Sequence, residues 1–228
     1  MSPTKPGGEP LSWQGRLPPL LALIAGMSDV IGYLSFKVFT AHITGNIVII
    51  VASMVRGGPP NVGEVLAVPV FMIAIACVWG IAKVFGGRGK ALARLLLFLQ
   101  LGLFAVVLLI SAVYNPEANP QGVLAIVTPL IAVSAIASQY ALLRLTIPGA
   151  PSTAVMTGNT TSLILSLLDS ISRGEPLTKG PREQLKRTGG ALGGFIAGCL
   201  AGAAGVLWLG NLAWLFPVIA SLIAVALG

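Results

Sequence analysis

The sequence predicts an all-α polytopic membrane protein with six full transmembrane helices plus two half or re-entrant helices, arranged as an inverted internal repeat. Of the 228 residues, 55% are hydrophobic and only 9% are charged, whereas about 25% of the residues of a soluble domain carry charge. Several apolar stretches reach the roughly 20 residues that a helix needs to cross a bilayer. A polar motif that occurs twice indicates internal duplication.

The duplicated motif is Thr-Ala-x-x-Thr-Gly-Asn, at residues 40–46 and again at residues 153–159. Each Thr-Gly-Asn stands at the start of a short apolar run, where a helix N-terminus leaves backbone N–H groups free to meet a ligand. Two facing N-termini favour an anion or an electron-rich neutral solute. The alternative is that Thr and Asn only satisfy backbone groups exposed by a helix break. The expected substrate-binding residues here are Thr44, Gly45, Asn46, Thr157, Gly158, Asn159 and Thr160.

The chain begins with a polar leader, residues 1–16, whose Pro and Gly content predicts a disordered cytoplasmic segment. Residues 17–113 form the first transmembrane repeat, with apolar segments at 17–36, 39–55, 65–85 and 91–113. An external connection, residues 114–122, leads to the second repeat, residues 123–228, with segments at 123–145, 153–168, 189–208 and 212–227. The segments of the two repeats therefore correspond in four pairs.

Segments 39–55 and 153–168 are too short to be assigned as full spans. Beyond Thr-Gly-Asn, each has a helical stretch of only about 16 Å, near half the hydrocarbon thickness. Cytoplasmic loops are enriched in Lys and Arg. If neither short segment crosses, both strongly basic connections, at residues 83–94 and 173–187, lie in the cytoplasm together with both termini, and the repeats are inverted. The alternative is eight full spans with parallel repeats.

Asp29 lies inside the first apolar segment. Because an ionised carboxylate at mid-helix costs about 2.5 to 3.5 kcal/mol to insert, we expect it to be paired, protonated or open to a cavity. Aligning the repeats places Gln139 at the corresponding position. We expect Asp29 to be a coupling or gating residue and Gln139 to be its neutral counterpart at the substrate site. The structural alternative is an ion pair of Asp29 with Lys37, Lys83 or Arg144.

Three other polar residues are candidates for coupling or gating. His42 is the only histidine, and it either senses pH and touches substrate or is a packing residue. Lys37 and Arg144 stand near the ends of segments 17–36 and 123–145. They are expected to draw anions into a vestibule, unless they only mark the membrane boundary.

Glycines recur every four residues from Gly190 to Gly202, a pattern typical of close helix packing, within the monomer or in a homodimer. Cys77 and Cys199 fall in the middle of apolar runs, so the sequence indicates neither a disulfide nor a metal site. It contains no nucleophile–base pair and no cofactor motif, so we expect no enzymatic activity and no cofactor. The basic charge is attributed to membrane topology and not to nucleic-acid binding.

A family resemblance rests on four features: Gly26-x-x-Asp29, the stretch 39–46, Gln139 and the second Thr-Gly-Asn motif. By these features the chain resembles the YoaK family of bacterial integral membrane proteins, over about residues 17–228. The resemblance implies a six-span, multi-pass protein of the bacterial inner membrane. It also implies a family of undefined activity, so it supplies no substrate.

Together these features predict a secondary transporter of a small anionic or polar solute, bound between two half-helix N-termini, with Asp29 as the proton-linked or gating group. One repeat would rock against the other. The alternatives are a passive channel and a non-transporting membrane scaffold, for which the face from Gly190 to Gly202 would be the working surface. The expected partners are the solute, the lipid bilayer and a second copy of the chain.

Overall fold

The computed structural model describes residues 12–86, 89–147, 156–173 and 179–228. These residues form α-helices joined by short connections, and no strand occurs among them, so the predicted all-α class is confirmed. The α-helices are α1 (Ser12–Phe36), α2 (Ile43–Val55), α3 (Val62–Val84), α4 (Lys90–Tyr114), α5 (Val123–Thr146), α6 (Met156–Arg173), α7 (Lys179–Leu209) and α8 (Leu215–Leu227). Two 3₁₀ helices accompany them, η1 (Pro116–Ala118) and η2 (Gly210–Trp214).

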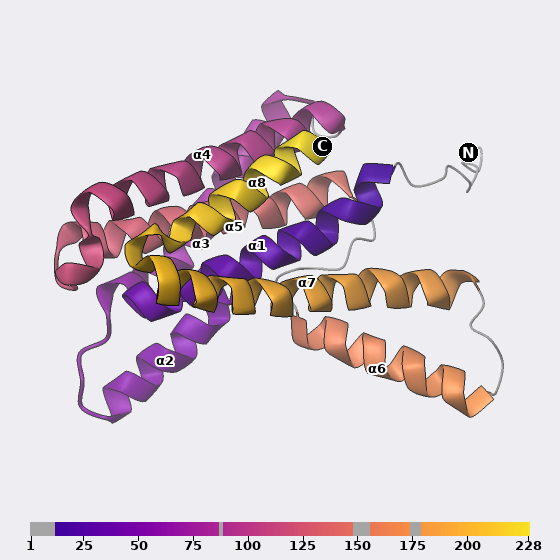
Figure 1. Ribbon diagram of the computed structural model, residues 1–228, viewed down its shortest axis with the longest axis horizontal. Helices are drawn as coiled ribbons and strands as arrows, with labels where there is room; N and C mark the ends of the chain where they lie inside the picture. Colours follow the sequence, from indigo (N-terminus) through magenta and orange to yellow (C-terminus); the bar gives the residue numbers. More distant parts are fainter. Residues whose placement is uncertain (1–11, 87–88, 148–155, 174–178) are drawn as a thin grey trace.

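Five stretches of the described chain are long and apolar enough to cross a membrane. The fifth is 46 residues long and holds most of α7 and all of α8, which turn back on each other at η2 (Figure 1). α2 is apolar but has only 13 residues. The five stretches are Gly15–Phe36, Val62–Val84, Lys90–Tyr114, Val123–Thr146 and Arg182–Leu227. They indicate a membrane protein.

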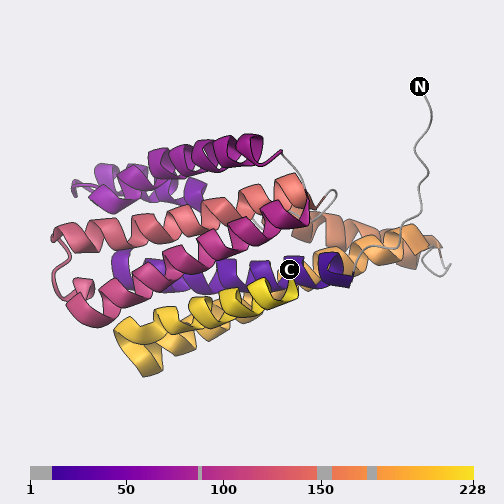
Figure 2. The ribbon, with the colours of Figure 1, turned by 90° about the horizontal axis from the view of Figure 1, so that it is seen from above.

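The long helices lie roughly along one axis, in alternating directions. α1, α4 and α7 run one way and α3, α5 and α8 run the other (Figure 1). α2 and α6 are exceptions, because both begin near the middle of the molecule and run toward opposite ends of the long axis (Figure 1). Seen from above, α1 and α5 lie in the interior, with α3 on one flank and α8 on the other (Figure 2). Many of the fully buried side chains accordingly come from α1 and α5.

The helices of the two halves pack in corresponding pairs. α1 packs on α7 and α8, α5 packs on α3 and α4, α2 packs on α3, and α6 packs on α7. The contact of α1 with α7 corresponds to that of α5 with α3, and the contact of α1 with α8 corresponds to that of α5 with α4. The contact of α2 with α3 corresponds in the same way to that of α6 with α7. The two halves thus use the same packing scheme around a shared α1–α5 contact.

α1 and α7 cross so closely that only glycine fits at the contact. A Cβ on Gly194 or Gly198 of α7 would collide with backbone atoms of Pro19 or Leu23 in α1, and one on Gly202 would come within 2.8 Å of the Met27 carbonyl oxygen. The glycine stripe is therefore a packing surface within the chain, which is one of the two outcomes expected for it.

Several helix boundaries differ from the predicted ones. α1 begins at Ser12, so the end of the expected leader is helical, while its first eleven residues lie outside the described part. α6 continues to Arg173, and α7 begins at Lys179, ten residues before its apolar run. The apolar pattern marks only the part of a helix that meets lipid, and Lys, Arg, Glu and Gln extend a helix into water at little cost. α2 begins at Ile43, because residues 37–42 form an irregular connection.

Candidate functional site

The connection between α1 and α2, residues 37–42, turns back over the end of α1. Lys37 takes a left-handed conformation with φ 61° and its N–H bonds to the Tyr33 carbonyl. The returning chain passes so close to Gly32 that a Cβ there would lie 2.8 Å from the Val38 carbonyl oxygen. A glycine in α1 thus lets the connection lie directly on the helix.

Asn46 fastens this connection from the first turn of α2. Its side-chain amide donates to the Phe39 carbonyl at 2.8 Å and accepts from the Phe39 N–H at 2.9 Å. The side chain is fully buried. Since both of its polar atoms are engaged, Asn46 acts here as a clamp on the polypeptide, which matches the structural alternative for the Thr-Gly-Asn motif.

Asp29 is buried beneath the connection with three hydrogen-bond donors around its carboxylate. Oδ1 accepts from the backbone N–H of Ala41 at 2.8 Å and of His42 at 3.3 Å. Oδ2 lies 2.5 Å from Nδ1 of His42. Asp29 is therefore paired, as its position in an apolar helix requires, but its partner is His42 and not the Lys37, Lys83 or Arg144 considered from the sequence.

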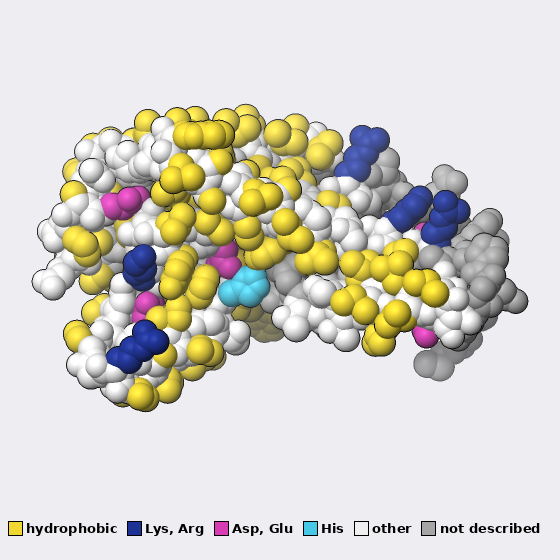
Figure 3. Space-filling view, turned by 60° about the horizontal axis from the view of Figure 1, so that its bottom comes forward, with side chains coloured by type: hydrophobic (Ala, Val, Ile, Leu, Met, Phe, Trp, Pro, Cys, Tyr) yellow, Lys and Arg dark blue, Asp and Glu magenta, His cyan; other side chains and the backbone are white. Residues whose placement is uncertain are grey.

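The imidazole of His42 bridges this carboxylate and the surface. A carboxylate only accepts, so His42 donates from Nδ1, which leaves Nε2 as the atom that gains or loses a proton. Its side chain is 36% exposed, and Figure 3 shows the single histidine of the chain at the surface. The centres of the His42 ring and of the Phe195 ring of α7 are 5.2 Å apart, in an edge-to-face arrangement.

The pKa of His42 is raised above its ordinary value. The hydrogen bond to Asp29 has the largest effect, partial burial opposes it, and the charge of Asp29 adds to it. His42 lies between α1 and α2, outside the five candidate spans. The imidazole of this pair therefore keeps its proton to a higher pH than an ordinary histidine does.

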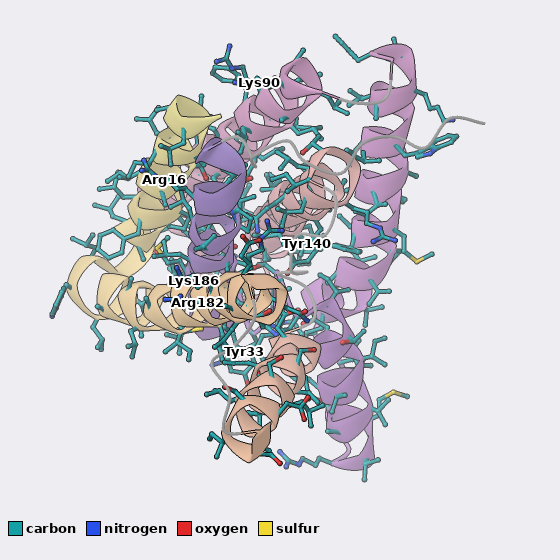
Figure 4. The ribbon with its side chains drawn as sticks, turned by 90° about the vertical axis from the view of Figure 1, so that its right-hand side faces the viewer. Arg16, Tyr33, Lys90, Tyr140, Arg182 and Lys186 are labelled. Carbon is teal, nitrogen blue, oxygen red and sulfur yellow. The ribbon has the colours of Figure 1, made fainter. Side chains whose placement is uncertain are left out.

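Two further contacts bind the connection to its surroundings. The hydroxyls of Ser28 and Thr40 are 2.8 Å apart. The Tyr140 hydroxyl, from α5, donates to the Ala41 carbonyl at 3.1 Å, and Figure 4 shows this side chain among the helices of the interior. The first half of the chain is thus held at its break by a residue of the second half. Sequence reasoning missed Tyr140, although a polar aromatic inside an apolar run was a usable signal.

Gln139 belongs to a separate buried network. Its Nε2 donates to the Leu21 carbonyl at 2.9 Å, and its Oε1 accepts from Nε2 of Gln100 at 3.0 Å. Nε2 of Gln100 also approaches Oγ of Ser221 at 3.4 Å. These bonds join α1, α4, α5 and α8, so Gln139 ties helices together. Gln100 and Ser221 were missed, although each is a polar residue within an apolar segment.

The remaining predicted residues of the two motifs are more accessible. Thr44 is exposed and Gly45 is partly buried against the Phe39 ring. Thr157 and Gly158 are exposed in the first turn of α6. Asn159 and Thr160 are partly buried and each has an interaction partner. Residues 153–155, the start of the second motif, lie outside the described part.

Lys37 and Arg144 are not brought together in one vestibule. Lys37 follows α1 at the end of the molecule where α5 begins, whereas Arg144 lies in the last turn of α5 at the opposite end (Figure 1). Nζ of Lys37 lies 5.4 Å from the centre of the Tyr33 ring. Both side chains are exposed, which fits the alternative that they mark the membrane boundaries.

Comparison with known families matches residues 17–227 to the family model described as a protein of unknown function, DUF1275. The chain belongs to the DUF1275 family. Both Thr-Gly-Asn motifs and the Asp29–His42 pair lie inside the DUF1275 region. No curated protein and no solved structure matches the chain. Membership agrees with the expected family of undefined activity, and the narrower YoaK assignment stays a prediction.

The described residues of this site can transfer a proton and form hydrogen bonds. Among the described residues, no three side chains from His, Cys, Asp and Glu come together in a way that would hold a metal ion. What the site offers is one imidazole nitrogen backed by a buried carboxylate, beside the first turn of α2.

Proposed function

We propose that this chain is a secondary transporter of a small anionic or polar solute, in which protonation of the Asp29–His42 pair is linked to solute binding. One observation carries the proposal. The single histidine is hydrogen-bonded to a buried aspartate at the start of the short helix α2, and its side chain is 36% exposed. Titratable groups with raised or lowered pKa values cluster at functional sites.

The proposed architecture has six spans, α1, α3, α4, α5, α7 and α8, with α2 and α6 as half helices of two inverted repeats. The antiparallel directions of α1 and α5, of α3 and α7, and of α4 and α8 support inversion (Figure 1). The exchangeable packing of the two halves supports it too. At about 20 Å, the 13 residues of α2 fall short of the bilayer core. This favours a half helix over a full span for α2.

The proposed orientation has the basic end of the molecule in the cytoplasm. α1, α4 and α7 begin at this end of the molecule, and α8 ends there (Figure 1). Figure 4 views it directly, with Arg16, Lys90, Arg182 and Lys186 toward the reader. Four other basic residues lie toward this end of the molecule: Lys83 near the end of α3, Arg94 near the start of α4, Arg144 near the end of α5 and Arg187 in the first part of α7. By the positive-inside rule this end is cytoplasmic, in a bacterial inner membrane with both termini inside.

The groups proposed to meet the solute are those that the fold leaves available. They are Nε2 of His42, the hydroxyls of Thr44 and Thr157, and backbone N–H groups of the first turns of α2 and α6. Asn46 and Gln139 are assigned to structural roles, because their polar atoms are engaged elsewhere.

The proposed cycle follows from the charge on His42. The imidazolium adds a positive charge beside the positive end of the α2 dipole and attracts an anion. Loss of the Nε2 proton removes that charge, so the anion is released. Rocking of one half against the other would expose the site to each side in turn.

A thermal-shift screen of the purified protein tests the proposal. Inorganic anions, carboxylates and nucleobases are added at pH 5.5 and pH 7.5 to the wild type, Thr157→Val and Thr161→Val. Thr161 is the matched control, because it lies one turn along α6 and its hydroxyl donates to the Thr157 carbonyl. A ligand at a hundredfold excess over Kd stabilises by about 2.7 kcal/mol. A ligand that raises the melting temperature more at pH 5.5 than at pH 7.5, and does so in every protein except Thr157→Val, supports the proposal. If no ligand raises the melting temperature, or if one raises it equally in all three proteins, the proposal is refuted.

The two alternatives make different demands on the same residues. A passive channel needs no coupling, so its flux would survive Asp29→Asn, while proton-driven accumulation would not. A scaffold was expected to work through the glycine face of α7, but that face is covered by α1 of the same chain. This leaves the scaffold without its proposed surface and favours transport.

A further inference from the structure

Tyr140 of α5 meets the Asp29–His42 pair through one peptide group of the connection. Its hydroxyl donates to the Ala41 carbonyl at 3.1 Å. That carbonyl and the N–H of His42 belong to the same peptide, and this N–H donates to Oδ1 of Asp29 at 3.3 Å. Because the C=O and the N–H of a trans peptide point to opposite sides, Tyr140 and Asp29 hold the peptide from its two sides.

The orientation of this peptide decides how well Asp29 is bonded. Oδ1 receives two consecutive N–H groups, from Ala41 at 2.8 Å and from His42 at 3.3 Å, an arrangement with which backbones bind anions. The second bond is longer than the usual N–H···O distance of about 3.0 Å, so a small rotation of the peptide breaks it. The hydroxyl of Tyr140 opposes that rotation.

Two contacts fix where the Tyr140 hydroxyl lies. The Phe71 ring of α3 meets the Tyr140 ring edge to face, with the ring centres 6.0 Å apart. The preceding residue on α5, Gln139, bonds to the Leu21 carbonyl of α1 and to Gln100 of α4. The position of the hydroxyl therefore follows the position of α5 relative to its neighbouring helices.

Two titratable side chains besides His42 lie within reach of the Asp29 charge, Tyr140 of α5 and Cys199 of α7. Phenols and thiols ordinarily titrate above about pH 8, so both are neutral where an imidazole titrates. Lys37, in the same connection, is exposed, and α2 contains no Asp, Glu, Lys or Arg. The proton affinity of His42 therefore depends mainly on the carboxylate and on the hydrogen bonds that the carboxylate receives.

Hydrogen bonds to a carboxylate lower its affinity for a proton, because they favour the charged form. A donor on the carbonyl of a peptide also polarises the N–H of that peptide. The Tyr140 hydroxyl thus strengthens the bond from the His42 N–H to Asp29. Without the hydroxyl, the carboxylate keeps fewer donors and attracts the imidazolium proton more strongly.

We propose that Tyr140 is a positioning residue, through which the second half of the chain lowers the proton affinity of His42. It acts through the Ala41 carbonyl and Asp29. As a device that links protonation to motion, it rests on the proposed transport function, because rocking α5 against α1 would weaken this bond. As a statement about His42, it rests on the contacts alone and needs no solute for its test.

The test is an NMR titration of ¹⁵N-histidine in the full chain in detergent, where every imidazole signal comes from His42. Tyr140→Phe removes the hydroxyl and keeps the ring that meets Phe71. We expect the proton affinity of His42 to rise about two- to tenfold. Tyr33→Phe is the matched control, because the Tyr33 ring stacks on Phe39 of the same connection, and it should titrate like the wild type.

The double variant of Asp29→Asn with Tyr140→Phe shows whether the effect passes through the carboxylate. Its His42 should have the same pKa as in Asp29→Asn alone. The proposal is overturned if Tyr140→Phe has a His42 pKa equal to or below that of the wild type. It is also overturned if Tyr140→Phe raises that pKa as much in the Asp29→Asn background, or if Tyr33→Phe raises it equally.

A second probe keeps the hydroxyl in place. Fluorine makes a phenol more acidic, so 3-fluorotyrosine is a stronger donor than tyrosine. Its incorporation should lower the pKa of His42 in the wild type and leave it unchanged in Tyr140→Phe. An unchanged or higher pKa in the fluorinated wild type contradicts the proposal. Either failure leaves the proposed function to the thermal-shift screen, which does not vary Tyr140.

Discussion

Replacing Asn46 by alanine should destabilise the protein far more than any change at its exposed neighbour Thr44. The substitution removes two hydrogen bonds of 2.8 and 2.9 Å and strands both the N–H and the carbonyl of Phe39. Each buried polar group left without a partner costs about 1 to 3 kcal/mol. The sum is about 2 to 6 kcal/mol, and we expect the lower half of that range because these bonds are only partly buried.

Thermal and detergent-induced unfolding of the purified variants measure this difference. Thr44→Ala is the control, since an exposed substitution away from such contacts changes stability by less than about 0.5 kcal/mol. Losing the clamp also loosens residues 39–42, so the pairing of His42 with Asp29 should weaken in Asn46→Ala. If Asn46→Ala keeps wild-type stability and loses only solute binding, the clamp reasoning is wrong and Asn46 is a ligand.

Three other predictions concern packing, the buried network and pH. Gly198→Ala should lower the free energy of unfolding by about 1 to 3 kcal/mol, because its Cβ meets the Leu23 backbone. Gly193 lies in open space, so Gly193→Ala should keep wild-type stability. Equal stabilities of the two variants would contradict this prediction. Gln139→Leu should lower the free energy of unfolding by about 1 to 3 kcal/mol, and replacing Gln100 with leucine as well should restore part of that loss. If the effects of the two substitutions simply add, the two side chains do not stabilise each other. The raised pKa of His42 gives stability that is complete below about pH 6.5 and is lost as the pH rises through the folded-state pKa. Melting curves from pH 5 to 9 should show that loss in wild type and not in His42→Gln.

The helices were predictable where the apolar pattern is continuous. Segment 123–145 agrees with α5, and segment 91–113 falls within α4. The pattern is weaker where a helix leaves the bilayer, so the first ten residues of α7, from Lys179, were missed. Local sequence rules also identified the break at the first Thr-Gly-Asn motif, because a polar triplet before an apolar run is a local signal.

The partners of the polar residues were harder to predict, because they depend on how the chain folds back on itself. Asp29 and His42 are thirteen residues apart and meet only because Lys37 reverses the chain and Gly32 lets it lie close. Gln139 was matched with Asp29 by repeat position, but its contacts come from α4 and α1. Position in a repeat therefore indicated burial at both sites, but it did not identify the helices that surround Gln139.

The most direct test of the proton-responsive pair is an NMR titration of the imidazole nitrogens in protein labelled with ¹⁵N-histidine. Because the chain has one histidine, every signal belongs to His42. We expect a pKa above the ordinary 6.5 for His42, with Nδ1 protonated throughout and Nε2 titrating, and a lower pKa in Asp29→Asn. A pKa at or below 6.5 that does not change in Asp29→Asn would show that Asp29 does not raise the pKa of His42.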